Sequence, residues 1–157
     1  MTTLLKHMLR RMYTDVEYMS RQIYAFANIL EQAMNLDALF RALADRTRLR
    51  LLNLMRDQEV CVCYFVEVLR LSQPKISRHL AYLRRAGIVA ARREGTWMHY
   101  RIAVPKEAAA ARILDEVVSA LSEDREMKND LARLARACCA PQRFVNLKGA
   151  PVPVKSE

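Results

Sequence analysis

The sequence predicts a mainly α-helical fold with one small β-hairpin, in the order helix, turn, helix and wing. Its best-marked element is a helix over residues 72–86, in which apolar residues recur at helical spacing. These are Ile76, Leu80 and Leu83. Ser72 is the expected N-cap, and Pro74 suits the first turn because its missing N–H costs nothing there. Gly87 supplies the C-terminal stop.

Two short strands are expected directly after this helix. The apolar period changes to that of a strand over residues 88–92, and again over residues 97–102. Glu94, Gly95 and Thr96 lie between them and predict a tight turn. A helix-turn-helix with a β-wing is the simplest assembly of residues 61–101.

The polar side chains of the helix and wing predict that the partner is double-stranded DNA. Glutamine, lysine, serine, arginine and histidine can reach base edges and phosphates from a major groove. The alternative is a merely solvated helix face beside an exposed hairpin. The expected DNA-binding residues are Gln73, Lys75, Ser77, Arg78, His79, Tyr82, Arg92, Arg93 and His99.

The charge of the chain is concentrated in the same segment. The net charge is +9, and residues 41–101 alone hold 13 lysines and arginines against 5 acidic residues. Such a basic stripe on one part of a chain is typical of nucleic-acid binding. No apolar run approaches the length of a membrane span, and no signal peptide is visible. We therefore expect a cytoplasmic protein without a membrane partner.

The flanking segments predict long helices on both sides of the hairpin domain. Residues 1–36 lack glycine and proline and carry an unbroken heptad seam, which favours pairing with a second subunit over packing within one subunit. The seam residues are Leu5, Leu9, Met12, Val16, Met19, Ile23, Phe26 and Leu30. The expected parts are a dimerisation helix, a DNA-binding domain, C-terminal dimerisation helices with a cysteine pair, and a flexible tail: residues 1–36, 37–104, 105–140 and 141–157.

Smaller features complete the expected helices. Asp45 is the expected N-cap of a helix over residues 46–55, with Leu49, Leu52 and Met55 toward the core. The arginines on that helix, Arg46, Arg48 and Arg50, are expected to form a solvated face, from which Arg46 or Arg48 could contact a phosphate. Ser122 is the expected cap of the last helix, with Asp124 in its acidic first turn.

Residues 38–102 resemble the ArsR/SmtB family of metal-responsive winged-helix repressors, especially its arsenic-responsive members. The segments that carry the resemblance are ALFRALADRTRLRLL, CVC, SQPKISRHLAYLRRAGIV and RREGTWMHYRI. The resemblance implies a homodimer that represses from an operator and leaves it when a toxic metal or metalloid binds. It implies As(III) or Sb(III) as inducer, and no organic cofactor is expected.

Four cysteines supply the expected ligands: Cys61, Cys63, Cys138 and Cys139. Arsenic-responsive relatives usually add a third cysteine and an acidic residue to the CVC pair, but Val66 and Tyr64 occupy those positions here. Cys138 or Cys139, from either subunit, is expected to complete a three-sulfur site. The alternatives are two separate pairs, or a core Cys138 beside an exposed Cys139. Neither pair is expected to form a structural disulfide in a reducing compartment.

The helical geometry predicts how binding is transmitted. If Cys61 and Cys63 both lie on a regular helix, their side chains point about 200° apart, so ligation must distort that turn or use a frayed helix N-terminus. The distortion would then move the helix over residues 72–86. A helix N-terminus and nearby arginines are expected to lower the pKa of the thiols.

Other inducers and other functions remain as alternatives. Methylated trivalent arsenicals need fewer thiolates, and a thiol-based redox or reactive-sulfur sensor of the same fold would use the same cysteines. A zinc site on the helix after the wing is disfavoured because no histidine follows His99, and residues 1–60 hold no cysteine for a cadmium or lead site.

A thiol-dependent reductase is disfavoured because CVC is not CxxC and the chain has three glycines, too few for a nucleotide-binding loop. The chain is therefore not expected to be an enzyme.

Overall fold

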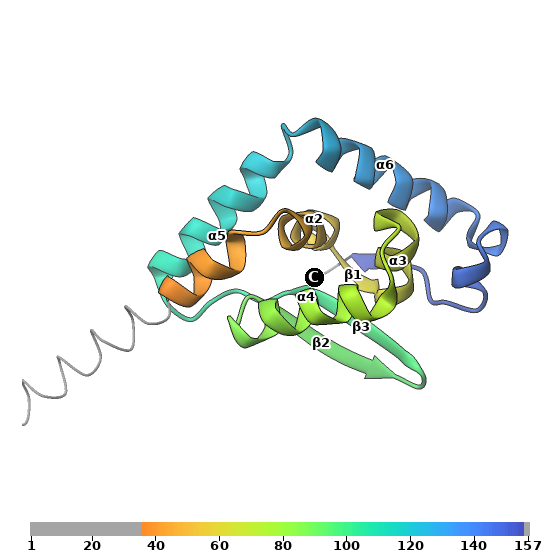
Figure 1. Ribbon diagram of the computed structural model, residues 1–157, viewed down its shortest axis with the longest axis horizontal. Helices are drawn as coiled ribbons and strands as arrows, with labels where there is room; N and C mark the ends of the chain where they lie inside the picture. Colours follow the sequence, from red (N-terminus) through yellow and green to blue (C-terminus); the bar gives the residue numbers. More distant parts are fainter. Residues whose placement is uncertain (1–35, 156–157) are drawn as a thin grey trace, which may run out of the picture. The chain divides into compact units, whose positions relative to one another are not determined.

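The computed structural model describes residues 36–155 (Figure 1). The chain divides into two compact units, Met1–Asp37 and Ala38–Glu157. The first unit lies almost wholly outside the described residues, and so does the predicted heptad seam. Across residues 36–155, none of the helices combines the length and the apolar character that crossing a membrane requires.

The second unit has a winged helix-turn-helix fold, as the sequence predicts. A helix over residues 36–43 precedes the labelled elements. These are α2 (Arg46–Met55), β1 (Gln58–Cys61), α3 (Val62–Leu69), α4 (Gln73–Arg85), β2 (Val89–Glu94), β3 (Trp97–Ile102), α5 (Ala108–Leu121), α6 (Arg125–Cys139), the 3-10 turns η1 (Pro141–Arg143) and η2 (Val145–Leu147), and β4 (Val154–Lys155).

Local capping explains the bounds of α2 and α4. The Asp45 carboxylate accepts a hydrogen bond from the backbone N–H of Arg48 at 2.9 Å, which caps α2 as predicted. Ser72 is the N-cap residue of α4, although its side chain makes no capping hydrogen bond. Gly87 follows α4 with φ +74°, a conformation that glycine adopts without a steric penalty. These residues fix the start and the end of α4.

The hairpin of β2 and β3 belongs to a larger sheet than the sequence predicts. Glu94 pairs with Trp97, so the turn consists of Gly95 and Thr96 alone. The sheet order is β2-β3-β1-β4, and every neighbouring pair is antiparallel. The strand β1 was not predicted. It places Cys61, its last residue, opposite His99 of β3.

The chain after α6 is folded, so the prediction of a flexible tail is wrong for residues 141–155. The two 3-10 turns follow α6, and Leu147 is 1% exposed. Strand β4 then pairs with β1 through Gln58 and Lys155, and through Glu59 and Val154. This segment therefore covers α3 and closes the edge of the sheet beside β1.

Two smaller predictions about the helices need correction. Asp124, not Ser122, is the N-cap of α6, because its carboxylate accepts from the backbone N–H groups of Glu126 and Met127. Ser122 instead ends α5. Leu49 of α2 is only half-buried, whereas Leu52 is fully buried. The expected apolar residues of α4, Ile76, Leu80 and Leu83, are all fully buried in the core.

Candidate nucleic-acid interface and thiol site

The outer face of α4 carries an exposed row of polar side chains. Four of the predicted contact residues are exposed: Gln73, Lys75, Ser77 and Arg78. A broad hollow lies along this face, and most of its lining is basic or aromatic. It is lined by Arg48, Lys75, Arg78, His79, Ala81, Tyr82, Arg84 and Arg85. The face can therefore offer both hydrogen-bond donors and positive charge to a polyanion.

Two of the predicted contact residues, Tyr82 and His79, are also held by their own domain. The Arg48 guanidinium lies 4.4 Å from the centre of the Tyr82 ring, and its Nε donates to the Ala42 carbonyl at 2.6 Å. His79 Nδ1 lies 3.4 Å from an oxygen of Asp45, the cap of α2. Arg48 is thus not the solvated arginine that the sequence predicts. It joins α2 to α4 and fixes the orientation of Tyr82.

The wing presents its three predicted residues differently. Arg93 is exposed at the tip, and Arg92 is exposed but its guanidinium pairs with Glu59 at 2.6 Å and with Glu94 at 2.7 Å. His99 is only 5% exposed, so the prediction that it lies on the outer DNA face is wrong. His99 lies on the same face of the sheet as its partners Cys61 and Arg92, and its Nδ1 is 3.7 Å from a carboxylate oxygen of Glu59.

Cys61 and Cys63 converge at the junction of β1 and α3. Cys61 is the extended N-cap residue of α3, with φ −70° and ψ 143°, and Cys63 lies in the first turn. The Cys63 S–H donates to Cys61 Sγ across 2.9 Å. The two side chains do not point apart as they would in a regular helix, because Cys61 is the N-cap of α3 and only Cys63 is helical. Both residues are buried, and no distortion of α3 is needed to bring the sulfurs together.

This contact divides the acidity of the pair unequally. The hydrogen bond from Cys63 lowers the pKa of Cys61 to about 7, and the backbone N–H groups of Cys63, Val62 and Met98 act in the same direction. The pKa of Cys63 is raised, first because its proton is held by Cys61 and then by burial. The predicted lowering thus applies to Cys61 alone, and it comes from the neighbouring thiol and backbone rather than from arginines.

We expect this acidity to appear in the ultraviolet absorbance of the thiolate, which does not require access to the buried sulfur. In Cys138→Ser/Cys139→Ser, half of the Cys61 thiolate absorbance should develop near pH 7. Adding Cys63→Ala removes the lowering hydrogen bond and should move that midpoint upward. An identical midpoint in both proteins would contradict this origin of the shift.

The other two cysteines lie at the end of α6 and do not complete a cluster. Cys138 is half-buried and Cys139 is exposed. Within residues 36–155 no three potential ligands among histidine, cysteine, aspartate and glutamate lie together. A three-sulfur site within one chain is therefore not preformed. Instead, α6 packs on α3 and brings Cys138 near Tyr64, whose pKa is raised to about 12 by burial and then by Cys138, Cys63 and Cys61.

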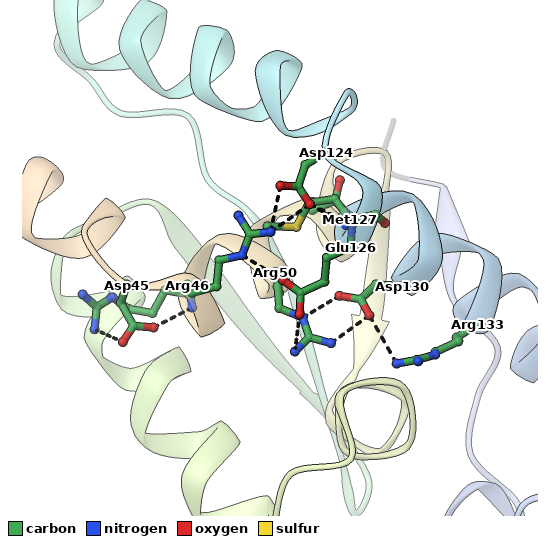
Figure 2. A network of polar contacts seen from close by, with 10 residues as sticks. Asp45, Arg46, Arg50, Asp124, Glu126, Met127, Asp130 and Arg133 are labelled. Carbon is green, nitrogen blue, oxygen red and sulfur yellow. Dashed lines mark hydrogen bonds and ion pairs between the residues drawn. The ribbon is translucent and has the colours of Figure 1, made fainter.

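Figure 2 shows a polar network between α2 and α6 that the sequence did not predict. Arg50 donates to both oxygens of Asp130, from Nε at 2.6 Å and from Nη2 at 2.8 Å. Arg46 binds Asp124 and Glu126 at 2.8 Å each. Asp130 is fully buried, and the apolar period of α6 had given no sign of it. The one available sequence signal was the series of arginines on α2 together with the acidic residues at the start of α6.

Comparison with known proteins agrees with this fold. Residues 45–91 match the family described as bacterial regulatory protein, arsR family. The chain is 43% identical over 103 residues to the "Arsenical resistance operon repressor" of Escherichia coli (strain K12), a match that spans 65% of this chain and 86% of that repressor. It is 45% identical over 104 residues to the "Arsenic resistance transcriptional regulator ArsR1" of Pseudomonas putida, spanning 66% of this chain and 80% of the regulator.

A solved structure supports the same assignment. HlyU from Vibrio cholerae N16961 superposes with a TM-score of 0.50 at 28% identity, over 57% of this chain and 94% of HlyU. The matched family segment includes α2, the CVC pair, α3 and all of α4. These are the elements that carry the basic face and the thiol pair. The chain therefore belongs to the ArsR family of bacterial transcriptional regulators.

Proposed function

We propose that the protein is a homodimeric repressor that leaves its operator when trivalent arsenic or antimony binds Cys61 and Cys63. The observation that carries the proposal is the convergence of two buried thiols, 2.9 Å apart, at the start of the helix that precedes α4. Cysteine sulfur is the preferred protein ligand for soft, thiophilic ions. The curated names of the two relatives, which mention arsenic resistance, favour the same inducer class.

The thiol pair is suited to bind such an ion. Cys61 supplies a thiolate near neutral pH, and Cys63 supplies a second sulfur once its proton is displaced by the ion. Because Cys61 also belongs to β1, a ligand there acts on both α3 and the sheet that contains the wing. The exposed Cys139 and half-buried Cys138 are not needed for this two-sulfur site.

Dimerisation is part of the proposal and has its own support. The apolar face of α5 is only half-buried in the single chain, at Ile113, Val117 and Val118. A second copy of the same helix would remove this surface from water. Two copies of α4 would then meet two half-sites of a pseudo-palindromic operator. Sedimentation velocity of the full chain should show a dimer.

The test is operator binding measured by fluorescence anisotropy under non-thiol reductant. Arsenite and antimonite should release the protein from a labelled operator, and zinc should not. A promoter fragment from the gene cluster that encodes the protein supplies the DNA. Tight binding that no trivalent metalloid reverses would defeat the proposed inducer while leaving the repressor assignment intact.

Removing one positive charge from α4 should weaken DNA binding specifically. Arg78→Ala is expected to lower operator affinity by roughly 1–3 kcal/mol if Arg78 reads a base, and to reduce the salt dependence if it binds phosphate. Arg136→Ala is the matched control, because it removes an equally exposed arginine from α6. Anisotropy at several salt concentrations measures both effects. Equal losses in the two variants would contradict the role of α4.

A second candidate function uses the same pair as a redox switch. The observation in its favour is that the pKa of Cys61 is lowered by Cys63, whose sulfur lies 2.9 Å away. A peroxide would remove two electrons and two protons from the pair, form a Cys61–Cys63 disulfide and be reduced to water or alcohol. This function would be favoured if peroxide released the protein from its operator, a reductant restored binding, and arsenite had no effect.

A further inference from the structure

The hydroxyl of Tyr64 is a polar group that the fold buries without a partner. Tyr64 follows Cys63 directly, in the first turn of α3, and its side chain is 0% exposed. Among the described residues, its Oη makes no hydrogen bond. A phenylalanine would fill the same space without burying an unpaired hydroxyl, which is unfavourable. Within residues 36–155 this hydroxyl is therefore left available to a bound ligand.

The surroundings of this hydroxyl are the thiols. Cys63 is its neighbour in sequence, and α6, which ends at Cys139, packs against α3. Cys61, the N-cap of α3, and Cys63 lie at the same end of this helix as Tyr64. A phenol has an ordinary pKa of about 10, so it is protonated at neutral pH, and burial raises the pKa of Tyr64 further. The hydroxyl is thus an unused donor beside the proposed ligands.

A trivalent metalloid bound by two thiols keeps one hydroxyl group, which can accept a hydrogen bond from this donor. Arsenous acid, As(OH)₃, exchanges one hydroxyl for each thiol that attacks it. Two thiols give (RS)₂AsOH and release two molecules of water, so one oxygen stays on the arsenic. No third cysteine lies with the pair in residues 36–155, and Val66 occupies the next position on the same face of α3. The retained oxygen is therefore not displaced within this chain.

We propose that Tyr64 determines inducer specificity, by donating a hydrogen bond to the one oxygen that the metalloid keeps when Cys61 and Cys63 bind it. The inference rests on the proposed function and refines it. The site is then built for an inorganic oxyacid with two sulfur ligands and one oxygen. Methylarsenite carries a methyl group in the third position, which leaves the hydroxyl unpaired. Tyr64 should thus favour arsenite over methylarsenite.

The decisive variant is Tyr64→Phe, which removes one oxygen atom. The arsenite concentration for half-release from the operator should rise about 3- to 10-fold, the effect of losing one buried hydrogen bond. The response to methylarsenite should stay the same or become more sensitive. Both titrations use a phosphine reductant, so that no added thiol takes the third position. An unchanged response to arsenite in Tyr64→Phe would overturn the inference.

Two further measurements make the test independent of DNA release. Arsenic K-edge absorption of the full-length wild type should show two sulfur neighbours and one oxygen, and three sulfurs would overturn the inference in favour of Cys138 or Cys139. Val66→Cys adds a third local thiol that can displace the oxygen. In the Val66→Cys protein, Tyr64→Phe should no longer change the response to arsenite. The melting temperature of Tyr64→Phe should equal or exceed that of the wild type, because the hydroxyl has no partner in the free protein.

The outcomes separate this inference from the function on which it rests. If arsenite neither binds the wild type nor releases it from DNA, the proposed function fails and Tyr64 has no ligand to select. If arsenite releases wild type and Tyr64→Phe equally, only the role of Tyr64 fails.

Discussion

Cys63→Ser is expected to abolish release by arsenite while operator affinity stays at the wild-type level. The exchange replaces one sulfur by an oxygen of similar shape, so the first turn of α3 should persist. It leaves a single thiolate, and the loss of the second attachment point should raise the arsenite concentration for half-release at least about 100-fold. Anisotropy titrations on the labelled operator measure affinity and release in the same experiment.

The matched control is Cys139→Ser, which makes the same exchange at an exposed thiol outside the pair. It should respond to arsenite like the wild type. If Cys63→Ser still responds normally, the Cys61–Cys63 pair is not the sensor. If Cys139→Ser also fails to respond, the vicinal pair of α6 contributes a ligand, in the manner that the sequence predicts.

Arg50→Met is expected to destabilise the fold more than any other exchange of a polar side chain on α2. It keeps the apolar stem of Arg50 but leaves the Asp130 carboxylate, which is 0% exposed, with only Arg133 at 3.7 Å. Breaking a fully buried pair typically costs about 3–5 kcal/mol. Because Arg50 is 16% exposed, we expect about 2–3 kcal/mol in the free energy of unfolding, measured by urea denaturation.

Arg46→Met is the control, because it makes the same exchange one turn earlier in the same network. The Arg46 side chain is 52% exposed, so water replaces its two carboxylate partners and the loss of stability should be much smaller. The double variant Arg50→Met/Asp130→Leu should recover much of the loss by removing the stranded charge. Equal losses for Arg46→Met and Arg50→Met would show that burial of Asp130 does not set the energy.

Much of the fold was accessible from local sequence signals. The bounds of α4 follow from Ser72, Pro74 and Gly87, and Asp45 marks the start of α2. Strand β1 was missed because four residues, QEVC, are too short to show a period and acquire their partners only from β3 and β4. The folded tail was missed for the same reason: its contacts are with β1 and α3, far away in sequence.

The site was predicted in its residues but not in its geometry. The sequence identified Cys61 and Cys63, yet it placed both on a helix, whereas the end of β1 makes Cys61 extended. His99 was placed on the wing's outer face because strand alternation does not reveal which face of a hairpin is covered. The role of Tyr64 had no sequence signal, since burial of a hydroxyl without a partner is a property of the packed structure alone.

The pairing of Cys61 with His99 ties the proposed sensor and the wing into one hydrogen-bonded sheet. Linkage then works in both directions: if bound arsenic weakens the grip on DNA by some factor, bound DNA must weaken the affinity for arsenic by the same factor. Molecules that are not on the operator should therefore capture the metalloid first. The number of protein molecules that are not bound to DNA would set the arsenic concentration at which repression is relieved. A strain that makes more of the protein should therefore need a higher arsenic concentration.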